Sequence, residues 1–185
     1  MSVKPGIKHQ DASAAALSVE STRLTNVAEF EGLLRIHDRS VRGVAYRLVG
    51  DDVDDVLQLA YLKAFEQRNS FRGDSSPRTW LYTIVYRTAV DHLRSGRRRT
   101  ASQHRAATSA IIADRADTVA DRMAVDAALA DLPVDQRVIL LMIDGQDMSY
   151  DDAATVLGVA NGTIASRIHR ARVAIRAALE RNEAE

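Results

Sequence analysis

Polar and basic side chains recur at helical spacing near the end of the chain, in SYDDAATVLGVANGTIASRIHRARVAI. The segment predicts a short helix, a turn that contains Gly158, and a second helix held on the core by Ile164 and Ile168. Small residues at Ala153 and Ala154 would let the two helices cross closely, as in a helix-turn-helix. Arginine can donate two hydrogen bonds to guanine, asparagine can pair with adenine, and serine or threonine can bind phosphate. We predict that duplex DNA is bound by Asn161, Thr163, Ser166, Arg167 and Arg170, and the alternative is an ordinary solvated basic face.

A second set of side chains could bind single-stranded nucleic acid, in FRGDSSPRTWLYTIVYRTAVDHLRSGRRR. Aromatic rings beside guanidinium groups can stack on unpaired bases and bind their phosphates. Because Trp80 also falls on an apolar stripe with Leu81 and Ile84, a purely structural role for this ring is the alternative. The candidate residues are Trp80, Tyr82 and Tyr86 with Arg72, Arg78, Arg87 and Arg94.

The sequence offers little for catalysis or metal binding. Its five histidines are dispersed, and none has metal-ligand spacing with a carboxylate or another histidine. The acids from Asp51 to Asp55 resemble the start of a calcium loop, but the required glycine and the closing glutamate are missing. We therefore expect no enzymatic activity, no cofactor and no metal site. A nucleic-acid hydrolase that uses these acids is a minor alternative.

The composition of the chain indicates the kind of fold that positions these residues and the compartment in which it works. The chain has 46% apolar residues, 5% aromatic residues and no cysteine, which favours helical cores built from aliphatic side chains and a reducing compartment. We find no apolar run of membrane-spanning length and no secretion signal, so we expect a cytoplasmic protein without membrane insertion. The 25 basic and 25 acidic residues cancel but are segregated, with five arginines and no acid between Asp91 and Asp114.

The periodicity predicts an all-α protein with two small helical domains. A flexible tail is expected over residues 1–24, a domain of three to four helices over 25–96, a flexible basic linker over 97–120, and a four-helix domain over 121–185. Asp51 or Asp52, Ser76 and Ser149 are predicted to cap helices at their N-termini, and Gly50 and Gly158 to end them. A short helix could also form in the linker, over IIADRAD.

Four motifs in this order resemble the extracytoplasmic-function sigma factors, which are specificity subunits of bacterial RNA polymerase. They are DDVDDVLQLAYLKAFE, then FRGDSSPRTWLYTIVYRTAVDHLRSGRRR, then LADLPVDQRVILLM, then SYDDAATVLGVANGTIASRIHRAR, and the resemblance covers roughly residues 27–181. It implies a non-enzymatic subunit that binds core RNA polymerase through the clamp of the largest subunit and the flap. It also implies promoter DNA, duplex and single-stranded, as a partner, and an anti-sigma factor as a regulator.

The resemblance also assigns residues to these partners. The clamp would contact Asp51, Asp54, Asp55, Gln58 and Leu59 on the second helix. The loop from Asn69 to Ser76 and the following helix would melt the downstream promoter element and hold a flipped base. The residues for that element are Asn69, Arg72, Ser75, Arg78, Thr79, Trp80, Tyr82, Arg87 and Arg94. The last helix would bind the upstream element as duplex.

Three positions depart from the family pattern. Leu59 stands where an acid is usual, Ala160 where a serine cap is common, and Ala165 where a lysine is common. If Asn161 replaces the serine as cap, its side chain is less free to contact DNA. The competing function is a dimeric helix-turn-helix regulator that binds a palindrome without polymerase.

Overall fold

The structure is a computed structural model that describes residue 24 and residues 26–96 and 119–182, and these residues form helices without strands. The first domain contains α1, α2 and α3, with two short 3₁₀ helices before and after α2. The second domain contains α4 to α7. The bounds are α1 Val27–Val49, η1 Gly50–Asp52, α2 Val53–Gln67, η2 Arg68–Ser70, α3 Pro77–Gly96, α4 Val119–Ala130, α5 Val134–Ile143, α6 Tyr150–Leu157 and α7 Asn161–Asn182. The predicted all-α class is confirmed.

Local signals in the sequence explain where several of these helices begin and end. The backbone N–H of Thr79 donates to Ser76 Oγ at 3.1 Å, and that of Asp152 donates to Ser149 Oγ at 3.1 Å, so both serines cap as predicted. Gly50 and Gly158 follow α1 and α6 with φ of 63° and 66°, a conformation that favours glycine. The caps therefore place the helix-turn-helix and the start of α3.

Asp52 holds the predicted position at the N-terminus of α2, but the predicted capping hydrogen bond from its side chain is absent. The 3₁₀ helix η1 leads directly into α2, and the Asp52 side chain makes no capping hydrogen bond. The Asp52 carboxylate instead lies 2.8 Å from His92 Nε2 on α3. Asp52 therefore joins two helices of the first domain rather than closing the end of one.

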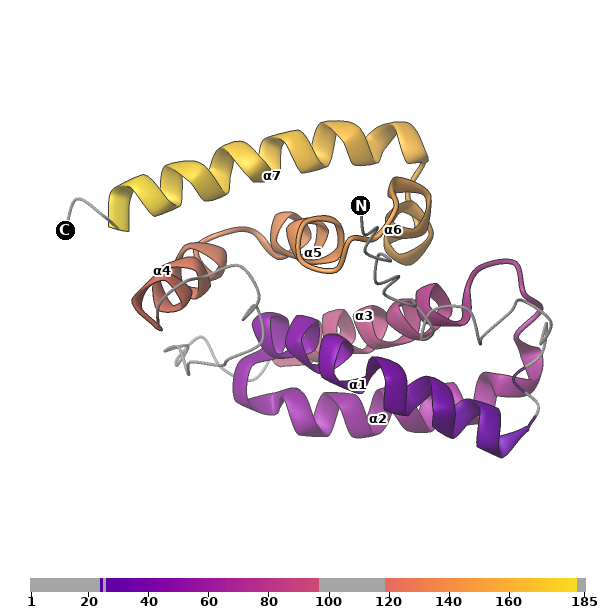
Figure 1. Ribbon diagram of the computed structural model, residues 1–185. Helices are drawn as coiled ribbons and strands as arrows, with labels where there is room; N and C mark the ends of the chain where they lie inside the picture. The colour runs from indigo at the N-terminus through magenta and orange to yellow at the C-terminus, as the bar shows by residue number, and fades with distance from the viewer. Residues whose placement is uncertain (1–23, 25, 97–118, 183–185) are drawn as a thin grey trace, which may run out of the picture.

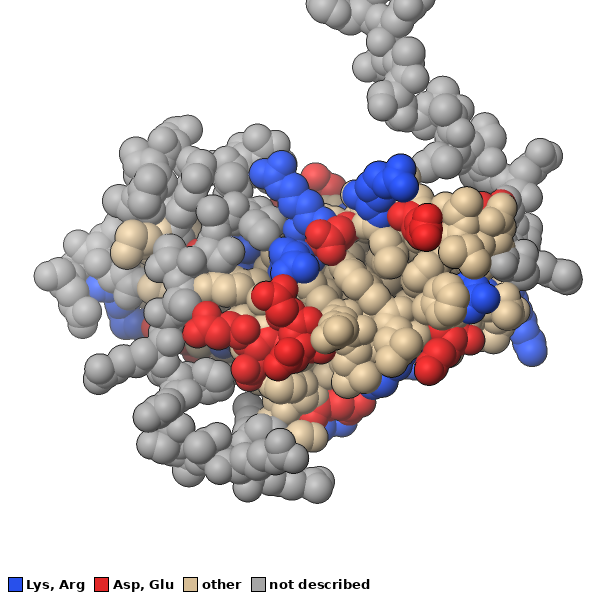
Figure 2. Space-filling view, turned by 90° about the horizontal axis from the view of Figure 1, so that it is seen from below, with Lys and Arg blue, Asp and Glu red and all other residues tan. Residues whose placement is uncertain are grey.

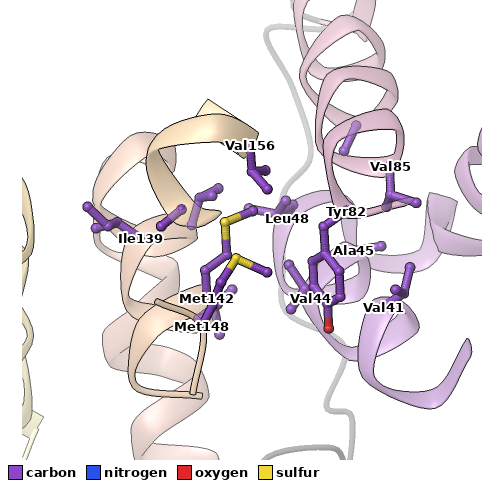
Figure 3. Close-up of a cluster of buried hydrophobic side chains, with 14 of the residues drawn as sticks. Val41, Val44, Ala45, Leu48, Tyr82, Val85, Ile139, Met142, Met148 and Val156 are labelled. Atoms are coloured by element: carbon purple, nitrogen blue, oxygen red, sulfur yellow. The ribbon is translucent and has the colours of Figure 1, made fainter. Parts of the chain in front are cut away.

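The two domains pack against each other and share a continuous apolar core. Helices α1 and α3 contact α4, α5 and α6, while α7 lies on the far side of the second domain (Figure 1). Figure 3 shows Met142, Met148 and Val156 of the second domain beside Leu48 and Val44 of the first. The contact buries apolar surface that each domain would otherwise expose to water.

Two of the predicted segments lie outside the described residues. They are the short linker helix over IIADRAD and residues 1–23 of the predicted tail. Leu24, the last residue assigned to that tail, is buried in the core. Nowhere in the described part of the chain does a helix combine the length and apolarity that a membrane span requires.

Candidate nucleic-acid interface

The outer face of α7 carries the residues predicted to bind duplex DNA. Ile164, Ile168 and Ala171 are buried and hold α7 on the second domain, so the opposite side of the helix faces solvent. Asn161, Ser166 and Arg170 are exposed, and Thr163 and Arg167 are half-buried. The structure therefore brings all five side chains together at the first half of α7.

The start of α7 is organised by the helix before it. The Asn161 side-chain amide donates a hydrogen bond to Asp151 of α6. The backbone N–H of Thr163 is bound by the carbonyl oxygen of Ala160 at 2.9 Å. The Asn161 side chain therefore binds an aspartate, and the Ala160 carbonyl oxygen accepts one of the N–H groups at the start of α7 that a serine side chain could otherwise bind.

Four residues predicted to bind single-stranded DNA are exposed on the first domain. Arg87 and Arg94 lie along α3, and Asn69 and Arg72 lie in the segment that precedes it. Trp80 is half-buried and packs on Phe71, with ring centroids 5.5 Å apart. The indole therefore contributes to packing, as the structural interpretation expects, and binding of a base by this ring stays a prediction.

Three further residues of this predicted set instead contact the second domain. The Arg78 guanidinium donates to the backbone carbonyl of Gln146, and the Tyr82 hydroxyl donates to Gln146 Oε1 at 3.0 Å. Thr79 Oγ1 donates to Asp152 Oδ1 at 2.7 Å. Thr79 and Tyr82 are each only 1% exposed, and burial raises the pKa of the Tyr82 hydroxyl. We call Arg78, Thr79 and Tyr82 the α3 polar patch.

Four of the five predicted polymerase-binding residues lie on the outer face of α2, and the fifth, Asp51, lies in η1 just before it. Asp51, Asp54, Asp55, Gln58 and Leu59 are all exposed. Figure 2 shows acidic side chains gathered beside an area without charge on this side of the molecule. An acidic and apolar surface of this kind fits a partner with basic and apolar groups.

The apolar part of this surface is larger than the sequence pattern suggested. Leu62 is 55% exposed and extends the stripe formed by Asp55, Gln58 and Leu59 along α2. Phe65 is 38% exposed, and the Arg68 guanidinium covers part of it, 3.8 Å from the ring centroid. The i, i+3, i+4, i+7 spacing of residues 55, 58, 59 and 62 is the signal that identifies Leu62.

Among the described residues, no three His, Cys, Asp or Glu side chains gather into a group that could hold a metal ion. The acids from Asp51 to Asp55 are used otherwise, since Asp52 contacts His92 and Asp54 pairs with Arg42. The geometry therefore gives no support to the hydrolase alternative.

Two family models match the chain in the order of its two domains. The model described as Sigma-70 region 2 matches residues 33–99, and the model described as Sigma-70, region 4 matches residues 122–175. The chain belongs to the sigma-70 family of sigma factors. Region 2 contains the α2 surface and α3, and region 4 contains the helix-turn-helix.

Relatives place this sigma factor in the extracytoplasmic-function group. It is 37% identical over 172 residues to the ECF RNA polymerase sigma factor SigM of Mycobacterium tuberculosis, covering 90% of this chain and 84% of the relative. It is 31% identical over 171 residues to the ECF RNA polymerase sigma-E factor of Escherichia coli, covering 85% and 90%. The stand-alone regulator is therefore not favoured.

Solved structures of similar chains agree with the two-domain helical fold. The sigma factor RpoE of Bartonella quintana, solved in complex with the anti-sigma factor NepR, matches with a TM-score of 0.72 and 28% identity. That match covers 83% of this chain and 98% of RpoE. The extracytoplasmic-function sigma factor SigJ of Mycobacterium tuberculosis matches with a TM-score of 0.52 and 27% identity, covering 81% of this chain and 53% of SigJ.

Proposed function

We propose that this sigma factor binds core RNA polymerase in the cytoplasm and directs it to promoters through two separate DNA contacts. Region 2 binds the downstream element as an opened strand, and region 4 binds the upstream element as duplex. The polymerase performs the chemistry, so the sigma factor contributes specificity and strand separation without a catalytic site of its own.

The observation that carries this proposal is the exposed polar face at the start of α7. Ser166, Arg167 and Arg170 project from a helix whose opposite side is buried, as in helices that enter the major groove. Arginine side chains there can bind guanine or phosphate, and Ser166 can bind either a base or phosphate. Asp151 holds the Asn161 amide group, which leaves the Asn161 carbonyl oxygen as the acceptor for a base or for water.

A second surface supports the polymerase contact. Asp55, Gln58, Leu59 and Leu62 form one exposed stripe on α2, with charged, polar and apolar groups in sequence. A stripe of this composition suits a helical partner that carries basic residues at its rim and apolar residues at its centre. We assign it to the clamp of the largest subunit and assign the flap to region 4.

An anti-sigma factor completes the proposal. The structurally similar RpoE was solved with the anti-sigma factor NepR bound. The exposed apolar residues of α2, among them Leu59 and Leu62, would give such a partner a surface to cover. A bound inhibitor there would compete directly with polymerase.

The test is copurification with core RNA polymerase after reversal of one charge on α2. Asp55→Arg places a cation where the partner surface is expected to be basic, so retention on core enzyme should fall by roughly ten-fold. Glu31→Arg makes the same change of charge at an exposed position of α1 and serves as the matched control. Equal retention of both variants and the wild type would show that α2 is not the docking surface.

A further inference from the structure

The α3 polar patch is already occupied in this structure by groups that resemble nucleic acid. Its three side chains donate to the backbone carbonyl of Gln146, to Gln146 Oε1 and to the Asp152 carboxylate. Carbonyl oxygens are the acceptors on the edges of guanine, cytosine and thymine, and a carboxylate is an anionic acceptor as a phosphate is. The second domain therefore satisfies the donors that would otherwise be available to bases and backbone.

We propose that the α5–α6 turn, residues 144–149, together with the first turn of α6, occupies the single-strand site of region 2 in the place of DNA. The free sigma factor thereby holds itself closed. The inference rests on the proposed function, because it takes the α3 polar patch to be part of the surface that binds the opened promoter strand.

Burial makes the two occupants mutually exclusive. Thr79 and Tyr82 are 1% exposed, so no base can reach either hydroxyl while the second domain remains in place. The neighbouring residues Arg72, Arg87 and Arg94 are exposed and remain able to attract phosphates. The closed form should thus bind single strands weakly and through charge alone, without the contacts that hold a base.

The acceptors are held in fixed positions by the second domain. Asp152 accepts two hydrogen bonds, from the Ser149 hydroxyl at Oδ2 (2.6 Å) and from the Thr79 hydroxyl at Oδ1 (2.7 Å). Ser149 in turn caps α6. Because the same carboxylate belongs to the start of the helix-turn-helix, occupation of the region 2 site also fixes α6, the first helix of that motif, against α3.

A second contact, remote from the patch along the chain, secures the closed form. Arg47 Nε of α1 donates to Asp126 Oδ1 of α4 at 2.9 Å, with the arginine side chain only 7% exposed. Arg137 of α5 donates to the backbone carbonyl of Arg47 at 2.8 Å. A buried arginine that loses its carboxylate is strongly disfavoured, so removing Asp126 should favour the open form, in which water solvates Arg47.

The test compares two double variants with the same change in composition. Asp126→Ala with Gln146→Ala removes one side chain from each of the two contacts between the domains. Asp131→Ala with Gln67→Ala removes an aspartate and a glutamine at exposed positions, where Asp131 pairs at 3.8 Å with exposed Arg181 and interacts through charge with Arg137, both in its own domain. Neither pair alters the α3 polar patch, and both lose one negative charge.

The measurements are the radius of gyration from small-angle X-ray scattering and the affinity for a fluorescently labelled single-stranded DNA oligonucleotide of mixed sequence. The Asp126/Gln146 variant should have a larger radius and bind the oligonucleotide roughly ten-fold more tightly than the wild type, because apparent affinity rises with the open fraction. The control pair should match the wild type in both. The single variant Gln146→Ala, which keeps the ion pair, should change both quantities in the same direction by less.

Expansion without a gain in affinity would overturn the inference, and so would a variant that keeps the wild-type radius. Transcription by core RNA polymerase with the wild-type chain separates these failures from a failure of the proposed function. If the chain directs initiation while the opened variant gains no affinity, region 2 is not blocked by the α5–α6 turn but the sigma-factor role stands. If the chain supports no initiation, the proposed function fails whatever the oligonucleotide shows.

Discussion

The two surfaces proposed to bind DNA differ in exposure and in their hydrogen-bond partners. On α7, Ser166 and Arg170 face solvent, and the hydrogen bonds they donate go to carbonyl oxygens of their own helix. On α3, Thr79 and Tyr82 are buried and bonded to another domain. The surface of region 4 proposed to bind DNA is thus open to solvent, whereas the surface proposed for region 2 is covered in part by the second domain.

This difference has an energetic consequence. A ligand of α7 needs to displace only water and local hydrogen bonds, which are nearly balanced by the new ones. A ligand of the α3 polar patch must also separate the domains and expose the apolar cluster around Met142, Met148 and Leu48. Binding of region 2 to DNA should therefore be coupled to opening, and binding of region 4 should not.

The largest expected effect concerns what holds α7 in place. Ile168 is 2% exposed, so Ile168→Ala should lower the free energy of unfolding by about 2–5 kcal/mol. Val173, on the exposed side of the same helix, provides the control, and Val173→Ala should change stability by less than about 0.5 kcal/mol. Urea denaturation measures both. Equal losses would show that α7 is not anchored by its inner face.

The next largest effect is expected on promoter selectivity, when one side chain proposed to contact DNA bases is removed from α7. Arg167→Ala should weaken selective recognition of the upstream element by about 1–3 kcal/mol for a lost base contact, while retention on core polymerase is unchanged. Arg176→Ala removes an exposed arginine from the second half of α7 and should leave selectivity intact. The measurement is transcription by reconstituted holoenzyme from promoters altered one base pair at a time. Identical promoter preferences of wild type and Arg167→Ala would contradict the assignment.

A threonine on each surface provides a direct comparison of the two. Thr79→Val removes a hydroxyl that donates to Asp152 and lies 2.8 Å from Ser76 Oγ, so it should cost about 1–2 kcal/mol of stability. Thr163→Val, on the half-buried outer face of α7, should cost less than about 0.5 kcal/mol and should instead alter binding of the upstream element. Thermal unfolding of the two variants provides the measurement. If Thr163→Val lost as much stability as Thr79→Val, the surfaces of α7 and α3 would not differ in the way proposed, as an exposed and a covered surface.

Sequence reasoning succeeded where the relevant physics is local. The caps at Ser76 and Ser149 and the turn at Gly158 depend on neighbours within a few residues, and helical periodicity then places the outer face of α7. The contacts of Tyr82 with Gln146 and of Arg47 with Asp126 span 64 and 79 residues, and no spacing rule connects such partners. The capping hydrogen bond predicted for Asp52 is absent for a related reason, since His92, 40 residues away, binds its carboxylate.

The smallest expected effect is a dependence of stability on pH that originates beside the covered surface. Burial, and then the positive charge of Arg78, lower the pKa of His37 on α1. The neutral imidazole is therefore favoured in the folded chain. Its contribution to folding stability is fully present above the unfolded pKa of about 6.5 and is lost as the pH falls through the lowered pKa of the folded state. His37→Gln removes this titration, so the variant should lose less stability than the wild type between about pH 7 and pH 5.5. The difference should be less than about 1 kcal/mol, because His37 is half-exposed and solvent screens the charge. Urea unfolding at the two pH values measures it, and parallel losses in the two proteins would show that protonation of His37 does not oppose the packing of α1 against α3.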